Sequence, residues 1–112
     1  MSGAVVAAGS RGRVRIADRV YTAIAARAAQ EALAPAWAPH GRRGPLPKVT
    51  VLVTRNAVRL TLHLELPFPA DIAALATTAR NAVTTEVTAL TGTPVSDLNV
   101  TIDRLHPAGP RR

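Results

Sequence analysis

Histidine and serine are the side chains through which this chain could carry out acid–base or nucleophilic chemistry, because it contains no cysteine. The three histidines, His40, His63 and His106, lie far apart in the sequence and form no paired-histidine motif. A zinc site needs several such ligands brought together, usually at short spacings. A metal site therefore has little support, and we interpret the histidines as solvated surface residues.

Nucleophilic catalysis has no better support. A Ser–His–acid triad would take Ser2, Ser10 or Ser96 as its nucleophile, and none of them lies in a nucleophile-elbow motif. The glycine-containing stretches 9–12 and 41–44 lack the spacing of a phosphate-binding P-loop and follow no strand, so we interpret them as turns or linkers. We expect no catalytic residue, cofactor, metal or small-molecule substrate, and predict that the protein is not an enzyme.

Length and composition predict one globular domain. The chain has 112 residues, of which 47% are hydrophobic and 3% aromatic, so its core must be aliphatic. The apolar N-terminus has no basic segment ahead of it, and we predict no signal peptide. No apolar stretch approaches the roughly 20 residues that span a bilayer. We expect a cytoplasmic protein whose association with the membrane is peripheral or borrowed from a partner.

The net charge of +7 is unevenly distributed. Residues 1–69 carry ten basic and three acidic side chains, whereas residues 70–106 carry two basic and four acidic ones. One interpretation is attraction to nucleic acid or anionic lipid. The interpretation that we favour is genome composition, because thirteen of the 14 basic residues are arginine and the chain is rich in alanine, as GC-rich coding would produce.

The elements that would position a functional side chain fall into one domain, residues 12–106. We expect a flexible N-terminal arm, residues 1–11, before it and a flexible basic tail, residues 107–112, after it. Residues 34–47 contain four prolines and two glycines and are interpreted as a connector. Trp37 lies in this connector. We expect it to cover the core, with a partner anchor as the alternative, because interface hot spots favour tryptophan.

The first elements of the domain are a strand and a helix. Residues 13–16 alternate polar and apolar side chains, as a short half-buried strand does. Asp18 is expected to be the N-cap of a helix that runs to about residue 33. Apolar side chains at four-residue spacing predict that one face of this helix is buried.

The clearest periodicity in the chain belongs to two further strands. Residues 49–54 and 58–66 alternate with period two, and Arg55 and Asn56 form the turn between them. Pro67 is expected to end the second strand, because proline cannot donate a hydrogen bond to the ladder.

A helix and a closing strand complete the domain. The helix carries Asp71 in its first turn and ends at Gly92, which suits the left-handed position after a helix. The closing strand covers residues 98–103. The order β-α-β-β-α-β predicts a single α+β domain of the split βαβ kind, with a mostly antiparallel four-stranded sheet and two helices on one face.

This pattern resembles the alkaline-shock-protein family of bacterial envelope stress-response proteins. The resemblance rests on the opening Gly12-Arg13-Val14-Arg15-Ile16-Ala17-Asp18-Arg19-Val20, on the passage 58–87, and on Leu90-Thr91-Gly92 followed by Leu98-Asn99-Val100-Thr101-Ile102. Together with residues 24–29 and Val95, these stretches extend over residues 12–105, most of the chain. The chain departs from the family pattern at residues 34–37, where a Gly-Val step is usual, and at Phe68-Pro69, where Tyr-Gly is frequent.

The resemblance implies a non-catalytic cytoplasmic protein with a role in the envelope stress response and cell-envelope homeostasis. It also implies self-association into homo-oligomers and binding to a membrane-anchored protein partner. The polar face of the predicted sheet could hydrogen-bond such a partner; the alternative, which we favour slightly for any single residue, is a solvated sheet face. The candidate partner surface consists of Arg59, Thr61, His63, Thr101 and Trp37.

The alternative function is that of a small basic nucleic-acid-associated protein, which would bind the phosphate backbone without reading the base sequence. Sheets with an open face also occur in RNA-recognition modules, but those modules stack bases on aromatic side chains. The polar face of the predicted sheet carries no aromatic residue. Base stacking is therefore not expected, whereas weak contact with the phosphate backbone stays open.

Overall fold

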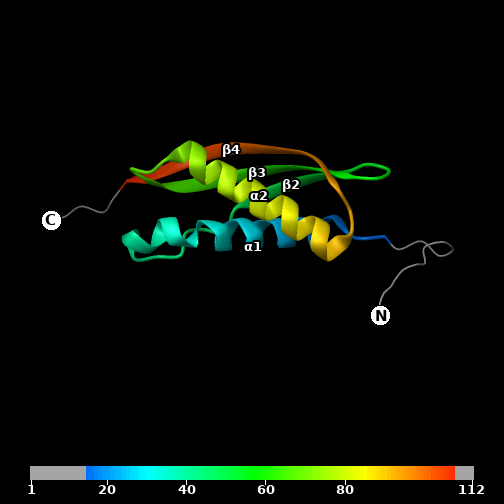
Figure 1. Ribbon diagram of the computed structural model, residues 1–112, viewed down its shortest axis with the longest axis horizontal. Coiled ribbons are helices and arrows are strands. Elements are labelled where there is room, and N and C mark those ends of the chain that lie inside the picture. Colours follow the sequence, from blue (N-terminus) through cyan, green and yellow to red (C-terminus); the bar gives the residue numbers. More distant parts are fainter. Residues whose placement is uncertain (1–14, 108–112) are drawn as a thin grey trace.

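Two helices and a three-stranded sheet form two layers (Figure 1). The computed structural model describes residues 15–107. Its elements in chain order are α1 (Asp18–Trp37), a 3₁₀ helix (Ala38–His40), β2 (Lys48–Val53), β3 (Val58–Phe68), α2 (Ile72–Thr91) and β4 (Val95–Pro107). β3 is the central strand, α1 packs mainly on β2, and α2 packs on β4 and on α1. In the described part of the chain, both helices cover the same face of the sheet.

Helix α1 differs from its prediction at both ends. Its N-cap is Ala17, so Asp18 lies in the first turn, where its carboxylate favours the helix dipole, and the prediction of an Asp18 cap is wrong. The helix also continues past residue 33, through Pro35, to Trp37. A proline inside a helix costs about 3 kcal/mol, and truncating a buried aromatic side chain costs about 3–5 kcal/mol. Burial of Trp37, which is 1% exposed, therefore offsets the proline.

The connector between α1 and β2 is shorter than predicted, because its first residues are helical. After the 3₁₀ helix, Gly41 and Gly44 have positive φ angles of 72° and 88°. The side chain of Gln30 on α1 donates a hydrogen bond from Nε2 to the Gly44 carbonyl oxygen, at 3.1 Å. The connector is therefore held against α1.

Strands β2 and β3 form the predicted antiparallel hairpin. The Thr54 N–H donates to the Ala57 carbonyl at 2.8 Å and closes the turn around Arg55 and Asn56. β3 does not stop at Pro67 but continues to Phe68. The pairing with β2 ends at His63, so no strand lies on that side of β3 at Pro67 among the described residues. The missing proline N–H therefore costs no ladder bond there.

Within residues 15–107 the sheet has three strands in the order β2-β3-β4, and β4 runs parallel to β3. In this part of the chain the prediction of a four-stranded, mostly antiparallel sheet is not matched. Arg13 and Val14 of the predicted first strand lie outside the described residues, and Arg15 and Ile16 belong to no strand. The connection from β3 to β4 passes through α2, and such a helical crossover is what parallel neighbours require.

Strand β4 is also longer than the predicted strand over residues 98–103. It includes Pro107, which the prediction had assigned to the flexible tail, and residues 108–112 lie outside the described residues. A bulge at Asp103 shifts the register, since Leu64 pairs with Ile102 and Glu65 with Arg104. A bulge interrupts the alternation of side chains, which explains why the pattern does not predict the strand beyond residue 103.

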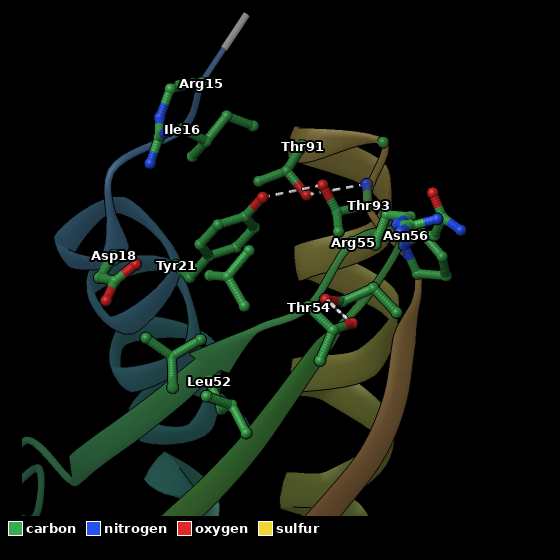
Figure 2. A pocket seen from close by; sticks show the side chains of 15 residues that line it. Arg15, Ile16, Asp18, Tyr21, Leu52, Thr54, Arg55, Asn56, Thr91 and Thr93 are labelled. Carbon is green, nitrogen blue, oxygen red and sulfur yellow. Dashed lines mark hydrogen bonds between the residues drawn. The ribbon is translucent and has the colours of Figure 1, made fainter.

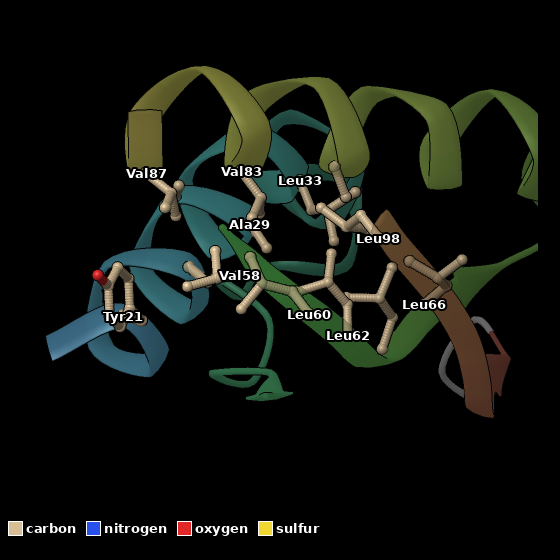
Figure 3. Packing of buried hydrophobic residues seen from close by; sticks show 14 of the residues in the cluster. Tyr21, Ala29, Leu33, Val58, Leu60, Leu62, Leu66, Val83, Val87 and Leu98 are labelled. Atoms are coloured by element: carbon tan, nitrogen blue, oxygen red, sulfur yellow. The ribbon is translucent and has the colours of Figure 1, made fainter. Parts of the chain in front are cut away.

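The core is aliphatic and is centred on the inner face of β3 (Figure 3). The alternate residues Val58, Leu60, Leu62, Leu64 and Leu66 are each 0–1% exposed. The helices contribute mostly small and branched side chains, with two aromatic ones, to the same cluster: Tyr21, Ala25, Ala28, Ala29, Leu33 and Trp37 from α1, and Ala79, Val83 and Val87 from α2. The alanines let the helices approach the sheet and each other closely. The predicted aliphatic core with inward-facing alternate strand residues is confirmed.

The ends of α2 are set by two local interactions. Asp71 is the N-cap, and its Oδ1 accepts a hydrogen bond from the Ala74 N–H at 3.0 Å. Gly92 follows the helix with φ 73°, as predicted for a left-handed C′ residue. The carboxylate therefore acts one position earlier than predicted, as a cap and not within the first turn.

Replacing Asp71 with alanine is expected to lower the free energy of unfolding by about 1 kcal/mol, because an orphan N–H of α2 loses its acceptor. Asp18→Ala is the matched control, since Asp18 lies in the first turn of α1 without capping it. Its expected cost is smaller, about 0.3–1 kcal/mol. Urea unfolding of both variants measures the difference. Equal costs, or no rescue by Asp71→Ser, would contradict the role of Asp71 as a cap.

A polar sheet face as the candidate interaction site

The face of the sheet opposite the helices, which we call the bare face, brings together most of the predicted partner surface. Four of its five residues, Arg59, Thr61, His63 and Thr101, alternate with core residues on β3 and β4. Thr101 lies directly opposite His63 in the β3–β4 register. Arg59 and Thr101 are exposed, whereas Thr61 and His63 are half-buried by their neighbours in the sheet.

Neighbouring strands widen this surface. Lys48 and Thr50 of β2 lie opposite His63 and Thr61, and Asn99 of β4 lies opposite Thr61 on the other side. The centre of the bare face therefore presents hydroxyl and amide groups that can both donate and accept hydrogen bonds. Such a surface suits a hydrogen-bonding partner better than one that buries a large apolar area.

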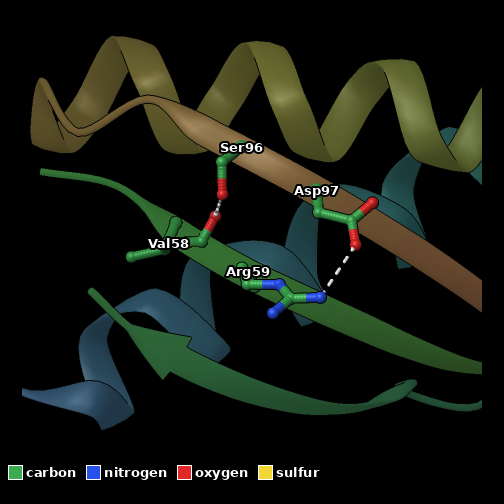
Figure 4. Close-up of polar contacts among 4 residues, drawn as sticks. All are labelled: Val58, Arg59, Ser96 and Asp97. Carbon is green, nitrogen blue, oxygen red and sulfur yellow. Dashed lines mark hydrogen bonds and ion pairs between the residues drawn. The ribbon is translucent and has the colours of Figure 1, made fainter.

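An ion pair crosses the face from β3 to β4 near the hairpin (Figure 4). Arg59 Nη2 lies 3.4 Å from Asp97 Oδ2, and the two side chains are 54% and 46% exposed. Beside it, the Ser96 hydroxyl donates to the Val58 carbonyl at 3.3 Å. An exposed pair of this kind contributes about 0–1 kcal/mol. It orients the guanidinium over β4 more than it stabilises the fold.

Two histidine–carboxylate contacts occupy the other end of the face. His106 Nε2 lies 2.6 Å from Glu65 Oε1, and His63 Nδ1 lies 3.4 Å from Asp103 Oδ1. Sequence reasoning did not find these contacts. The bulge at Asp103 moves the later residues of β4 by one position, and only the observed register places His106 beyond Glu65 on the same face.

The contact between His63 and Asp103 does not form an enclosed acid–base site. The two side chains are 31% and 44% exposed and lie on the open sheet face. General acid–base catalysis needs a partner group held against a substrate in a defined pose. Among residues 15–107, nothing around this pair encloses a substrate, so the contact fits a surface hydrogen bond.

The fifth predicted residue, Trp37, lies in the core and offers no free surface. It is 1% exposed, and the rings of His106 and His40 lie at 5.3 and 6.0 Å from its own. The guanidinium of Arg42 lies over the ring, 4.9 Å from its centre. Trp37 thus covers the core, as the favoured interpretation of the sequence held, and presents no exposed surface for the alternative role of a partner anchor.

Two of the three histidines therefore meet around Trp37, although they are far apart in sequence. Their surroundings do not make a metal centre: residues 15–107 contain no group of three or more His, Cys, Asp or Glu side chains arranged to hold an ion.

A cavity of about 770 Å³ opens at one end of the two layers (Figure 2). It lies between the start of α1, the hairpin turn and the loop after α2. Within it, the hydroxyls of Tyr21 and Thr93 hydrogen-bond each other at 2.9 Å, and the Thr93 N–H donates to Thr91 Oγ1 at 3.1 Å. Its lining includes one carboxylate, that of Asp18, and no histidine. The polar groups of the cavity thus tie the loop to both helices and form no acid–base pair.

Within residues 15–107, each helix is too short or too polar to cross a bilayer. Comparison with protein-family models gives no match to the chain, and neither does comparison with curated proteins.

Proposed function

We propose that the protein is a non-catalytic binding domain of the bacterial envelope stress response. It acts in the cytoplasm by associating with itself and by binding a membrane-anchored partner, which brings it to the inner face of the membrane. The resemblance to the alkaline-shock-protein family supplies the cellular role. The bare polar sheet face supplies the binding site.

The observation that carries the proposal is the contrast between the two faces of the sheet. One face is buried by α1 and α2 down to 0–1% exposure along β3. The other bears hydrogen-bonding side chains in register over three strands and has no covering layer among the described residues. A partner that covered Thr61 and Thr101 would find donors and acceptors already ordered by the sheet, which lowers the entropy lost on binding.

Introducing two long cations at the centre of the face is expected to weaken binding of the partner strongly. A Thr61→Arg/Thr101→Arg variant should lower recovery of the protein with membranes from its native cells by about tenfold, because interface centres tolerate little added bulk or charge. The matched control is Thr77→Arg/Thr88→Arg, which adds the same charge at exposed positions of α2. Fractionation followed by quantitative blotting measures recovery.

The control variant is expected to behave like the wild type. Equal losses in the two variants would contradict binding through the sheet face. Wild-type protein that stays wholly in the soluble fraction, with no membrane protein co-purifying, would contradict the membrane-anchored partner itself.

A second candidate function is non-specific binding of nucleic acid. The observation that favours it is charge: residues 15–57 carry seven basic and two acidic side chains. Tyr21 and Trp37 are buried in the core, and Phe68 at the end of β3 is the one exposed aromatic residue. Contact would therefore be mainly with phosphates and would weaken steeply with salt. Gel retardation of RNA or DNA over a salt series tests it, and no retardation at low salt would exclude it.

A further inference from the structure

Both edge strands of the sheet present unpaired backbone groups in the described part of the chain. On β2, the hydrogen bond from Thr54 to Ala57 closes the hairpin. The groups of an antiparallel strand alternate between its two sides. Counting back from Thr54, the N–H and C=O groups of Val53, Val51 and Val49 point away from β3, toward the open edge.

The same reasoning identifies the open groups of β4. The Val58 N–H donates to the Pro94 carbonyl at 3.0 Å, so Val58, and with it Leu60, directs its backbone groups toward β4. In a parallel ladder a residue bonds to the two neighbours of its register partner. Leu60 pairs with Leu98, and the alternation then leaves the groups of Leu98, Val100 and Ile102 facing outward.

The two edges belong to parts of the molecule with opposite charge. Residues 15–57, which include α1 and β2, carry seven basic and two acidic side chains. Residues 69–107, which include α2 and β4, carry two basic and four acidic ones. Pairing two β2 edges, or two β4 edges, would bring like charges together. Pairing a β2 edge with a β4 edge brings opposite charges together.

We propose that copies of this chain assemble head to tail, the β2 edge of one copy pairing with the β4 edge of the next. The inference rests on the self-association in the proposed function and names the surfaces that carry it. β2 is antiparallel to β3 and β4 is parallel to it, so copies in the same orientation join through an antiparallel ladder. The polar face stays free for the other partner.

One register that fits the alternation of both strands places the inward-facing Val53, Val51 and Val49 opposite Leu98, Val100 and Ile102 of the next copy, so the apolar layer continues across the junction. The same register places Lys48 directly opposite Asp103 of the next copy. A shift of two residues either way keeps the apolar alternation but separates Lys48 from that carboxylate. The charge pair therefore selects the register.

A contact between two different surfaces does not close on itself as a two-fold dimer does, and it generates rings or open filaments. In a repeating assembly, each copy adds two helices at about 9 Å each to one layer and three strands at about 4.8 Å each to the other. The helical layer is therefore the wider of the two. The assembly must therefore curve, with the helices on its outer side and the bare polar face on its inner side. The mass of the assembly is expected to rise beyond that of a dimer as protein concentration increases.

Reversing the charge of Lys48 or of Asp103 tests the proposal. Lys48→Glu and Asp103→Lys are each expected to lower the association constant about tenfold, because each turns the attraction into a repulsion. The double variant, with the two charges exchanged, is expected to restore it. Arg19→Glu, on α1, makes the same charge change off both edge strands and is the control. Sedimentation velocity at low salt over a concentration series measures the mass.

A backbone variant tests the edge itself. Val53→Pro removes an outward N–H, leaves the ladder with β3 intact, and changes a side chain that is 43% exposed. Added in small amounts to wild-type protein, it is expected to shorten the assemblies, because it can join through β4 but cannot extend through β2.

The outcomes separate the inference from the proposed function. Wild-type protein that remains a monomer at every concentration overturns self-association itself. Assemblies that grow no larger than a dimer overturn the pairing of β2 with β4 but not self-association. The same conclusion follows if the charge reversals and Val53→Pro do not change the mass of the assemblies.

Discussion

Replacing Leu62 with alanine is expected to lower the free energy of unfolding by about 2–5 kcal/mol. Leu62 lies in the middle of β3, is 0% exposed, and belongs to the core cluster that both helices share with the sheet. Removing three carbon atoms there leaves a cavity that neither the sheet nor the helices can close. A domain of this size has a total stability of about 5–15 kcal/mol, so the variant loses a large part of it.

Trp37 provides the measurement, because it is the one tryptophan of the chain and is 1% exposed. Its fluorescence in a urea titration reports unfolding, and the midpoint is expected to fall with little change in slope. Thr101→Ala, at an exposed position of β4, is the control and should change stability by no more than about 0.5 kcal/mol. A Leu62→Ala variant as stable as this control would contradict the close packing of Leu62 in the core.

Replacing Gly44 with alanine is expected to cost about 2–4 kcal/mol, although the residue lies in a connector. A Cβ atom at Gly44 would lie 2.4 Å from both Cδ1 and Nε1 of Trp37. Gly44 also has a φ of 88°, which side chains rarely adopt. The indole cannot move away freely, because His106 and Arg42 pack against it. The substitution therefore combines a steric overlap with backbone strain.

Gly41→Ala separates the two causes. Gly41 has a similar φ of 72°, but a Cβ there would meet nothing within 4 Å. Its substitution should cost only the strain of a left-handed residue, about 1 kcal/mol. Urea titration and near-ultraviolet circular dichroism of the indole measure both variants. Equal costs at the two glycines would show that the contact with Trp37 contributes nothing.

The two binding modes that we propose use different parts of the sheet. Head-to-tail pairing uses the backbone edges of β2 and β4, whereas partner binding uses side chains such as Thr61 and Thr101 on the bare face. The reversal Lys48→Glu and the face variant should therefore have separable effects, one on mass and one on membrane recovery. A surface repeated along an assembly would also bind a clustered membrane partner more tightly than a single copy does.

Much of the fold was predictable because short-range sequence patterns specify its strands, its turn and its helix ends. The period-two alternation over residues 58–66 specifies a strand with one apolar face, and β3 has five alternate residues at 0–1% exposure. Gly92 after an apolar stripe predicted the end of α2, since glycine adopts a positive φ with little strain. The hairpin turn and three of the four partner-surface residues on the bare face, those on β3, follow from the same alternation.

The predicted ends of helices and strands were wrong where tertiary contacts outweighed the local preference of a proline. Pro35 should end α1, yet the helix continues because Trp37 fills the core. Pro67 should end β3, yet the strand continues because its neighbour β2 has already ended. At Pro35 the burial of Trp37 offsets the cost of the proline, whereas at Pro67 no ladder hydrogen bond is lost.

The sequence by itself determined the identity of the hairpin, of α2 and of the faces that they bury, because side-chain alternation and backbone preference act over a few residues. The tertiary structure decided that the sheet formed by residues 15–107 is mixed and three-stranded, that β4 lies parallel beside β3, and that Trp37 is buried. It also decided which side chains meet across the strands, such as His63 with Asp103 and Glu65 with His106. These features depend on which distant elements pack together, and that choice is made by the summed burial of the whole core and not by any one segment.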